Sequence, residues 1–364
     1  MTKRKTIILS LIAALSALLL GFVCYFGVQY YLQNRIVFNI KDTLPDGEGK
    51  RAHVIILAGQ SNASGCSLDE YLKKNVSEEK YAEYQNGYEN VYINYLSGEN
   101  RSEEFVKCAT LQGEISGGFG PELGLAEKLH ELYPDETFFI VKCAWGGTNL
   151  FEQWLSPSSK GKTGELYKQF VSYVETSVKY LKSKNYDVQI EGMCWMQGES
   201  DSFSVEHSER YGEHLNNLIT DIRKNFSKYS SEDGIAFVDA YIAPNPMYWV
   251  YYESVNRGKD EVSELSAMNV IVDTISAGLD CSQEPEGAPD IPHYDSLSEI
   301  KLGHLFAEEI AAFLDISTNN RVQKCTVSAF GSSLYQRMGY YTKSPWTDSE
   351  EIFTFISHQT KATS

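Results

Sequence analysis

Short apolar runs alternate along the chain with longer stretches of helical periodicity, and this alternation constrains the fold more than any other feature. A strand, a helix and a second strand in that order form the repeating unit of a parallel sheet. We therefore predict an α/β fold, a three-layer α/β/α sandwich around a mostly parallel, five-stranded central sheet. The expected strands are 53–58, 91–95, 137–143, 190–196 and 235–242, and the expected helices are 121–133, 165–181, 205–226, 261–279 and 299–314.

The N-terminal segment differs from the rest of the chain in charge and hydropathy. Residues 7–28 carry no charge, and as a helix this run is about 33 Å long, enough to cross a membrane core of about 30 Å. Lys3, Arg4 and Lys5 precede it, and basic flanks stay on the cytoplasmic side. We predict a single-pass helix in the cell membrane, with the remaining chain extracellular. The alternative is secretion after signal cleavage, although a signal peptide's apolar region usually spans about 7 to 15 residues.

Changes in composition divide the chain into four parts. We expect a membrane anchor over 1–38, a linker over 39–52, an α/β domain over 53–316 and a C-terminal extension of unassigned role over 317–364. The net charge of −17 repels phosphate backbones, so nucleic acid is excluded as a partner.

The cysteines are too irregularly spaced for a disulfide scaffold. Cys143 and Cys194 lie in apolar runs and are expected to be buried thiols. Pairing stays open among four others, Cys66, Cys108, Cys281 and Cys325. No CxxC, HExxH or EF-hand pattern occurs, so we predict no metal site.

Ser61 follows the first predicted strand in the segment Gly59 to Asn62. A serine at a strand-to-helix turn exposes its hydroxyl at the sheet edge and places its N–H among the helix's free donors. Gly59 permits the tight turn, so the segment suits a nucleophile. An ordinary helix N-cap gives the same pattern. The segment lacks the last glycine of the GxSxG elbow, which disfavours the α/β-hydrolase fold.

Two further segments offer donors for developing negative charge. Residues 117–122 are glycine-rich and lead into a predicted helix. Their backbone N–H groups can approach a ligand oxygen closely, although a plain loop before a helix has the same composition. Residues 195–201 follow a strand and place the amide of Gln197 at the sheet edge, where a buried polar group usually has a defined task.

Asp290 and His293 precede the last predicted helix. A general base must lie near its serine and be oriented by a carboxylate, and this spacing supplies both groups from one loop. A DxxH pair also arises by chance. Surface or core positions are expected for His130, His207, His214 and His304.

In this order, the segments resemble the SGNH hydrolase superfamily, and within it the acetyl xylan esterase and sialate O-acetylesterase group. The similar blocks are 59–62 (GQSN), 120–122 (the second block), 144–149 (the GGT segment), 195–201 (WxQGExD) and 290–293 (DxxH). The resemblance covers about 53–314 and implies a flavodoxin-like sheet. Ala63, where methionine is frequent in the group, departs from it.

The resemblance implies roles for individual residues. Ser61 is the expected nucleophile, His293 the base and Asp290 the acid that orients it. Glu199 is the alternative acid. The expected oxyanion hole consists of the backbone amides of Ser61 and Gly120 and the side chain of Gln197, with Gly118 as an alternative to Gly120. Substrate binding is expected from Gln60, Asn62, Gly147 and Thr148.

We therefore expect a carboxylic ester hydrolase that removes acetyl or another small acyl group from a carbohydrate, without a cofactor. Two alternatives stay open. One is a carbohydrate O-acyltransferase, which passes the acyl group to a sugar hydroxyl, and the other is a non-catalytic carbohydrate-binding protein on the same fold. Release of acetate in plain buffer distinguishes the hydrolase from both.

Overall fold

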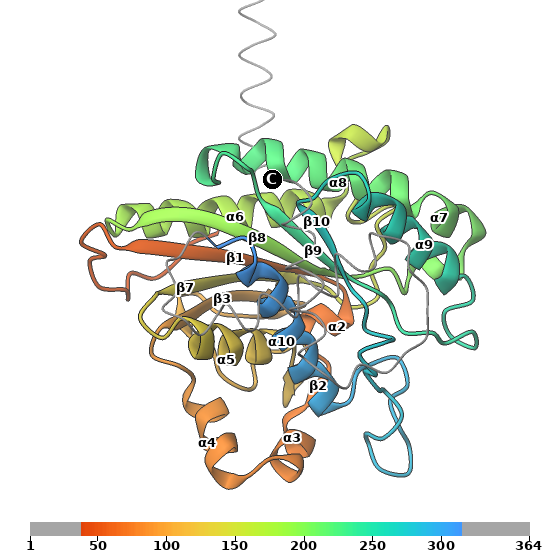
Figure 1. Cartoon of the computed structure of the whole chain (residues 1–364), viewed down its shortest axis with the longest axis horizontal. Coiled ribbons are helices and arrows are strands. Elements are labelled where there is room, and N and C mark those ends of the chain that lie inside the picture. The colour runs from red at the N-terminus through yellow and green to blue at the C-terminus, as the bar shows by residue number, and fades with distance from the viewer. Residues whose placement is uncertain (1–37, 315–364) are drawn as a thin grey trace, which may run out of the picture. The chain divides into compact units, whose positions relative to one another are not determined.

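One eight-stranded sheet organises residues 38–314, the part of the chain that this computed structural model describes (Figure 1). Its strand order is β10-β9-β8-β1-β7-β3-β4, with β5 paired to β3. The strands are β1 (Arg51–Gly59), β3 (Val91–Ser97), β4 (Asn100–Arg101), β5 (Val106–Lys107), β7 (Phe138–Ala144), β8 (Asp187–Met196), β9 (Ala236–Ala240) and β10 (Asn269–Val272). A separate antiparallel pair joins β2 (Ser67–Leu68) to β6 (Gly118–Phe119).

All five predicted strands are present, but the predicted strand number is wrong. Six strands run parallel, because β10 pairs with β9 at one edge. The expected helix over 261–279 is also wrong. The helix α9 (Tyr252–Ser263) ends at Ser263, near the start of this range, and β10 follows from Asn269. β-Branched residues Val270, Ile271 and Val272 favour a strand, and the sequence pattern had merged this strand with the end of the helix.

Helices cover both faces of the sheet, as predicted. In Figure 1, α6, α8 and α9 lie on one face and α5 and α10 on the other. The predicted helix over 205–226 is broken at Arg210 into two. The helices are α2 (Ser61–Ser64), α3 (Asp69–Asn75), α4 (Glu78–Asn86), α5 (Glu122–Leu132), α6 (Glu165–Ser183), α7 (Val205–Glu209), α8 (Tyr211–Phe226), α9 and α10 (Ser296–Ala311), and short 3₁₀ turns occupy Pro157–Ser159, Asp201–Phe203 and Ser227–Tyr229.

The central strands read as continuous apolar runs because both of their faces are covered. Every residue of β7 is buried, and so is every residue of β1 after Arg51. Helices α5 and α10 approach closely on their face of the sheet. A Cβ added to Gly124 would lie 2.0 Å from Ile300 O, and one added to Gly303 would lie 2.2 Å from Pro121 O. This contact fixes α10, and with it the loop that precedes it.

The topology places a switch point at the carboxyl ends of β1 and β8. From β1 the chain continues to β3 and β7 on one side, whereas from β8 it continues to β9 and β10 on the other. Open α/β sheets bind ligands at such a point. The register aligns Gly59 with both Ala144 and Met196, so the loops after β1, β7 and β8 begin at one level.

Several predictions fall on residues that the structure does not describe. The predicted membrane helix over 7–28 and the extension over 317–364 lie outside 38–314, and the domain limits stay predictions. Within 38–314 no helix combines the length and hydropathy needed to cross a membrane. The buried thiols predicted at Cys143 and Cys194 are confirmed. Three further cysteines in this range are also free, Cys66, Cys108 and Cys281.

Candidate active site

The turn from β1 into α2 presents Ser61. Gly59 has φ +142°, and a Cβ there would lie 1.9 Å from Met196 O, so only glycine fits this turn. Gln60 N then donates to Met196 O at 2.9 Å. Ser61 begins α2 and is 9% exposed. Within residues 38–314, neither its Oγ nor its backbone N–H has a hydrogen-bond partner, so both are available to a ligand.

The loop before α10 places a carboxylate on the predicted base. His293 Nδ1 lies 2.6 Å from Asp290 Oδ2, and His293 N donates to Asp290 O at 2.9 Å. The His293 side chain is 23% exposed and that of Asp290 is 49% exposed. No hydrogen bond joins His293 Nε2 to Ser61 Oγ or to any other group in the described range. A catalytic hydrogen bond is often loose before substrate binds.

Asn62 holds this loop beside Ser61. Its Nδ2 donates to Pro292 O at 3.3 Å, and its Oδ1 accepts from Tyr294 N at 3.1 Å. Asn62 Nδ2 also donates to Glu199 Oε1 at 2.9 Å. The structure therefore brings the serine segment, the histidine loop and the segment after β8 together.

Glu199, which accepts from Asn62, is almost fully buried, with 1% of the residue exposed. Its Oε2 is buried and has no hydrogen-bond partner within 38–314. Burial raises the pKa of Glu199, and the hydrogen bond from Asn62 and the charges of Lys259 and His293 act in the opposite direction. The two acids predicted as alternatives thus contact different partners.

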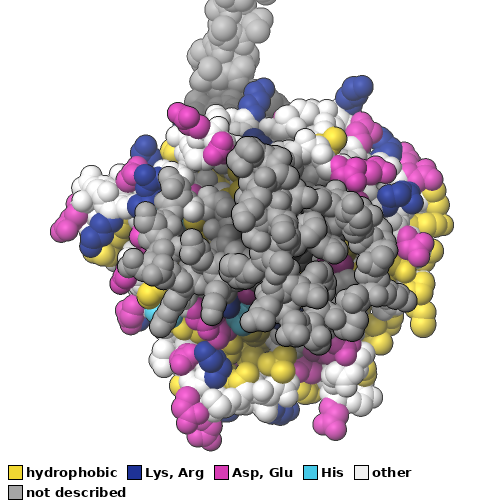
Figure 2. Space-filling view, in the orientation of Figure 1, with side chains coloured by type: hydrophobic (Ala, Val, Ile, Leu, Met, Phe, Trp, Pro, Cys, Tyr) yellow, Lys and Arg dark blue, Asp and Glu magenta, His cyan; other side chains and the backbone are white. Residues whose placement is uncertain are grey.

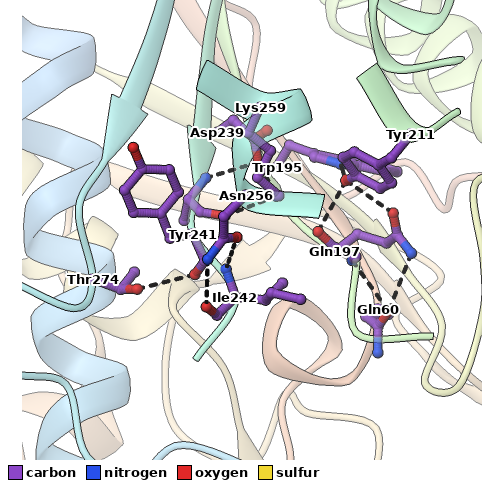
Figure 3. Close-up of polar contacts among 12 residues, drawn as sticks. Gln60, Trp195, Gln197, Tyr211, Asp239, Tyr241, Ile242, Asn256, Lys259 and Thr274 are labelled. Atoms are coloured by element: carbon purple, nitrogen blue, oxygen red, sulfur yellow. Dashed lines mark hydrogen bonds and ion pairs between the residues drawn. The ribbon is translucent and has the colours of Figure 1, made fainter. Parts of the chain in front are cut away.

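Gln197 is held by several polar partners, of which Figure 3 shows Tyr211 and Gln60. Its Nε2 lies 2.6 Å from Asp201 Oδ2, 3.0 Å from Thr148 O and 3.2 Å from Gln60 Oε1. Its Oε1 accepts from Tyr211 at 3.1 Å. Gln197 is fully buried, and both amide hydrogens are used by protein acceptors. To hold an oxyanion, this side chain would have to release one of them.

Gln60 is oriented by the same network. Its Oε1 faces three donors, Gln197 Nε2, Ser200 N at 3.2 Å and Gly198 N at 3.4 Å. In Figure 3 the Nε2 of Gln60 points away from Gln197, and it has no partner within the described range. Gln60 therefore retains a free donor, as substrate binding requires.

The two predicted glycine donors are already engaged. Gly118 N donates to Ile115 O at 2.9 Å, and Gly120 N donates to Glu122 Oε1 at 2.9 Å. Glu122 is fully buried and pairs with Lys142 at 2.7 Å, so its carboxylate is fixed. Neither amide reaches an oxyanion unless its bond is broken.

The loop after β7 offers a different amide. Gly146 N donates to Glu114 Oε2 at 2.8 Å, and Ser64 of α2 donates to the same oxygen. This carboxylate joins the loop to the helix that Ser61 begins. Gly147, the next residue, is exposed, has φ +69° and has no atom within 4 Å of an added Cβ. Its N–H has no partner within 38–314.

Thr148, predicted to bind substrate, has its hydroxyl occupied. It donates to Trp145 O at 2.7 Å and accepts from Trp154 Nε1 at 2.9 Å. The Thr148 side chain therefore stabilises its own loop and has no free donor for a substrate.

Sequence reasoning missed two acids that shape the site. Asp201 accepts from Leu150 N at 2.9 Å, from Phe151 N at 3.3 Å and from Gln197. It therefore joins the segment after β8 to the loop after β7. Its spacing of four residues from Gln197 was a usable signal. Glu114 had none, because its partners Ser64 and Gly146 are distant in sequence.

A buried ion pair lies against Tyr211, the residue that donates to Gln197 Oε1. Lys259 Nζ is 2.6 Å from Asp239 Oδ1 and 5.4 Å from the centre of the Tyr211 ring. Burial raises the pKa of Asp239 to about 6 and that of Asp201 to about 7.

In the described range, no group of three or more His, Cys, Asp or Glu side chains is placed to hold a metal ion. Figure 2 shows acidic side chains scattered over the visible face of the described part.

Residues 51–312 match the family model described as "Carbohydrate esterase, sialic acid-specific acetylesterase". Among curated proteins, the "Probable 9-O-acetyl-N-acetylneuraminic acid deacetylase" of Escherichia coli (strain K12) is 25% identical over 151 residues, 36% of this chain and 43% of that protein. A "Probable carbohydrate esterase" of Arabidopsis thaliana is 28% identical over 112 residues, 30% of this chain and 38% of that protein. The matched segments thus span about two fifths of each relative's length.

Solved structures support the fold. The crystal structure of NanS has a TM-score of 0.53 at 17% identity and covers 74% of this chain and 98% of its own. A crystal structure of a protein from Arabidopsis thaliana has a TM-score of 0.51 at 20% identity and covers 73% and 100%, respectively. At these identities the likeness concerns the fold alone, and it agrees with an α/β domain around a mostly parallel sheet.

Proposed function

The chain belongs to the carbohydrate esterase family of sialic acid-specific acetylesterases, and we propose that it hydrolyses acetyl esters of a carbohydrate through Ser61, His293 and Asp290. The family membership agrees with the motif resemblance in the sequence. Ester hydrolysis is the reaction class that the family's description gives. The sugar and the position of its acetyl group belong to the proposal.

One observation carries the proposal: Asp290 binds His293 Nδ1 at 2.6 Å while His293 Nε2 stays free within the described residues. A carboxylate on Nδ1 keeps the proton there, so Nε2 is the basic nitrogen. Asn62 holds the same loop against the residue next to Ser61. These contacts support the proposal that Ser61, His293 and Asp290 act together at the switch point of the sheet.

These groups account for each step of hydrolysis. Ser61 Oγ attacks the acetyl carbonyl carbon, and its proton passes to His293 Nε2. The tetrahedral intermediate collapses, and the sugar oxygen leaves with that proton. His293 then removes a proton from water, the resulting hydroxide attacks the acyl-enzyme, and acetate is released while Ser61 regains its proton. Asp290 stabilises the imidazolium in both halves.

For the oxyanion hole, we propose the backbone amides of Ser61 and Gly147. Both N–H groups lack a partner in the described range, whereas those of Gly118 and Gly120 and the amide of Gln197 are engaged. The register of β1 and β7 brings the two loops to one level. Donors fixed before the reaction stabilise developing charge without reorganisation.

The location outside the cell is proposed from sequence. The uncharged run over 7–28 and the basic residues before it support an anchor in the cell membrane, with the esterase extracellular. Sequencing the N-terminus of the mature protein tests it. A soluble, secreted form that begins near residues 25–40 would refute the anchor and leave the esterase unaffected.

The test of the activity compares Ser61→Ala with the wild type in the full-length chain. Acetate release is measured with 4-nitrophenyl acetate, 9-O-acetylated sialic acid and acetylated xylan, and a serine-reactive phosphonate labels the nucleophile for mass spectrometry. Ser77→Ala is the matched control, because Ser77 caps α4 through the Lys80 amide and contacts Glu79, both outside the site.

We expect Ser61→Ala to remove the phosphonate adduct and to lower kcat by several orders of magnitude, roughly a millionfold at most. Its melting temperature should stay close to that of the wild type. Ser77→Ala should keep full activity. Acetate release by Ser61→Ala at the wild-type rate, or a wild type that releases no acetate from any of the esters, would overturn the proposal.

A further inference from the structure

We propose that Asn62 is a positioning residue, whose side-chain amide couples the buried Glu199 carboxylate to the loop that carries His293. This inference rests on the proposed function, because it assigns a task within the same site. It differs from the substrate-binding role that the sequence suggested for Asn62.

The contacts of Asn62 bracket His293 on both sides. Nδ2 donates to Pro292 O at 3.3 Å, and Oδ1 accepts from Tyr294 N at 3.1 Å. The same Nδ2 donates to Glu199 Oε1 at 2.9 Å. Because Asn62 follows Ser61 directly in the chain, a loop fixed to Asn62 is also fixed relative to the nucleophile.

The orientation of the amide is determined by its partners. A backbone N–H only donates, so the atom of Asn62 that faces Tyr294 N must be oxygen. The nitrogen then faces a carboxylate and a carbonyl, which only accept. Asn62 is 3% exposed, and both of its amide hydrogens are used, so it cannot donate to a substrate without releasing Pro292 O or Glu199.

Glu199 gives this amide a partner that is difficult to replace. The carboxylate is almost fully buried, and Asn62 is its side-chain hydrogen-bond donor. A buried carboxylate that loses such a donor incurs the full desolvation penalty. Asp290, in contrast, is half exposed and cannot by itself hold the loop in place. Asn62 and Glu199 together therefore restrain the loop on both sides of His293, beside the bond that Ser67 Oγ donates to Tyr294 O at 2.6 Å.

The test uses an exchange of groups across the Asn62–Glu199 hydrogen bond in the full-length chain, with 4-nitrophenyl acetate as the substrate. Asn62→Ala removes all three contacts. Asn62→Asp keeps the acceptor for Tyr294 but sets two carboxylates against each other. The double variant Asn62→Asp/Glu199→Gln restores one donor and one acceptor with their places exchanged.

We expect Asn62→Ala to lower kcat about a hundredfold, as a misplacement of about 1 Å does, with little change in KM. Asn62→Asp should be similarly impaired, and the double variant should regain at least about tenfold in kcat over Asn62→Asp. Glu199→Gln alone should lose less activity than Asn62→Asp, because the carbonyl oxygen of the introduced amide still accepts from Asn62. A purely structural role would not give this pattern of recovery.

A second measurement tests the contact between Asn62 and Tyr294 independently of esterase activity. Exchange of the Tyr294 amide hydrogen, followed by NMR, should accelerate in Asn62→Ala and return toward the wild-type rate in the double variant. Asn90→Ala is the matched control. Like Asn62, Asn90 donates from its Nδ2 to two acceptors, in this case Tyr133 O at 3.0 Å and Glu136 O at 2.8 Å, but it lies at the amino end of β3. It should keep the wild-type kcat.

Three outcomes would overturn the inference: wild-type kcat in Asn62→Ala, a double variant no better than Asn62→Asp, or unchanged Tyr294 exchange. If Asn62→Ala does not fold, the comparison of Asn62→Asp with the double variant decides. A wild-type chain without esterase activity overturns the proposed function instead, and Tyr294 exchange then still decides whether Asn62 holds the loop.

Discussion

Asp290 Oδ2 lies 2.6 Å from His293 Nδ1, whereas the second candidate acid, Glu199, is bound to Asn62. Asp290, which binds the imidazole, is half exposed. Glu199 is buried and accepts a hydrogen bond from Asn62, which in turn contacts the His293 loop. An acid on Nδ1 fixes the tautomer of the base. The two acids therefore make different predictions for charge-removing substitutions.

Asp290→Asn should lower kcat by at least about a hundredfold, because an amide at this position can donate to Nδ1 and stabilise the wrong tautomer of His293. Glu199→Gln should lower kcat by less than about tenfold, since glutamine keeps an acceptor for Asn62. Steady-state kinetics of the two variants on 4-nitrophenyl acetate provides the comparison. The reverse ranking would assign the acid's role to Glu199.

The sequence was informative where the chemistry depends on neighbours along the chain. Asp290 and His293 are three residues apart, so one loop could be expected to pair them, and Ser61 follows a strand whose apolar run is unmistakable. It was less informative where partners come from distant segments. Gln197 has an amide that suits an oxyanion hole, but the acceptor Thr148 O, which occupies it, lies in another loop. Likewise, nothing near Asn62 indicates Tyr294 as its partner.

The same limit applies to the fold. The four residues of β10 have the composition of a strand but follow a helix after only a short turn, so the periodicity of the two segments merged. Only the pairing of Asn269 with Phe237 and of Val272 with Ala240 distinguishes them. The strand preference of these residues was therefore correct, whereas the predicted end of the preceding helix was wrong.

Gly147→Ala tests the loop that we propose for the oxyanion hole. The new methyl group should project into the open space around Gly147 and, if this loop faces the acyl group as proposed, lower kcat/KM by about tenfold, with a strain of about 1 kcal/mol from the positive φ. Gly234→Ala is the control, because Gly234 also has a positive φ and open space around it, but precedes β9 at the opposite end of the sheet. It should lose similar stability and keep kcat/KM. Equal activities of the two variants would argue against the Gly147 loop.

Gly59→Ala should be much more damaging to stability than either of these substitutions. Its Cβ would overlap Met196 O at 1.9 Å, and the backbone at φ +142° disfavours any side chain. Relief requires β1 and β8 to separate, which should cost at least about 3 kcal/mol in the free energy of unfolding. Urea denaturation of Gly59→Ala and Gly234→Ala measures the difference. Similar midpoints would show that the turn tolerates a side chain.

The last prediction concerns the pH dependence of stability, which the buried acids set. Burial raises the pKa of Asp201 from its usual 3.8 to about 7, and the hydrogen bonds from Gln197 and Leu150 only partly oppose this shift. Burial also raises the pKa of Asp239 to about 6, so this group changes the pH dependence of stability in the same direction. Between about pH 4 and pH 7 the folded chain therefore holds protons that the unfolded chain has lost.

It follows that the free energy of unfolding falls as pH rises through this window, by up to about 4 kcal/mol for a three-unit shift of one group. Below about pH 4 both states are protonated at Asp201, and the contribution is fully present; above about pH 7 it is lost. Urea denaturation at half-unit pH intervals should show the decline, and Asp201→Asn should reduce its slope by the equivalent of about one proton. Asp46→Asn is the control, because the exposed Asp46 has a pKa lowered by the Glu48 amide and does not titrate in this window. A slope that Asp201→Asn leaves unchanged would show that Asp201 stays ionised in the folded chain, with its three donors outweighing its burial.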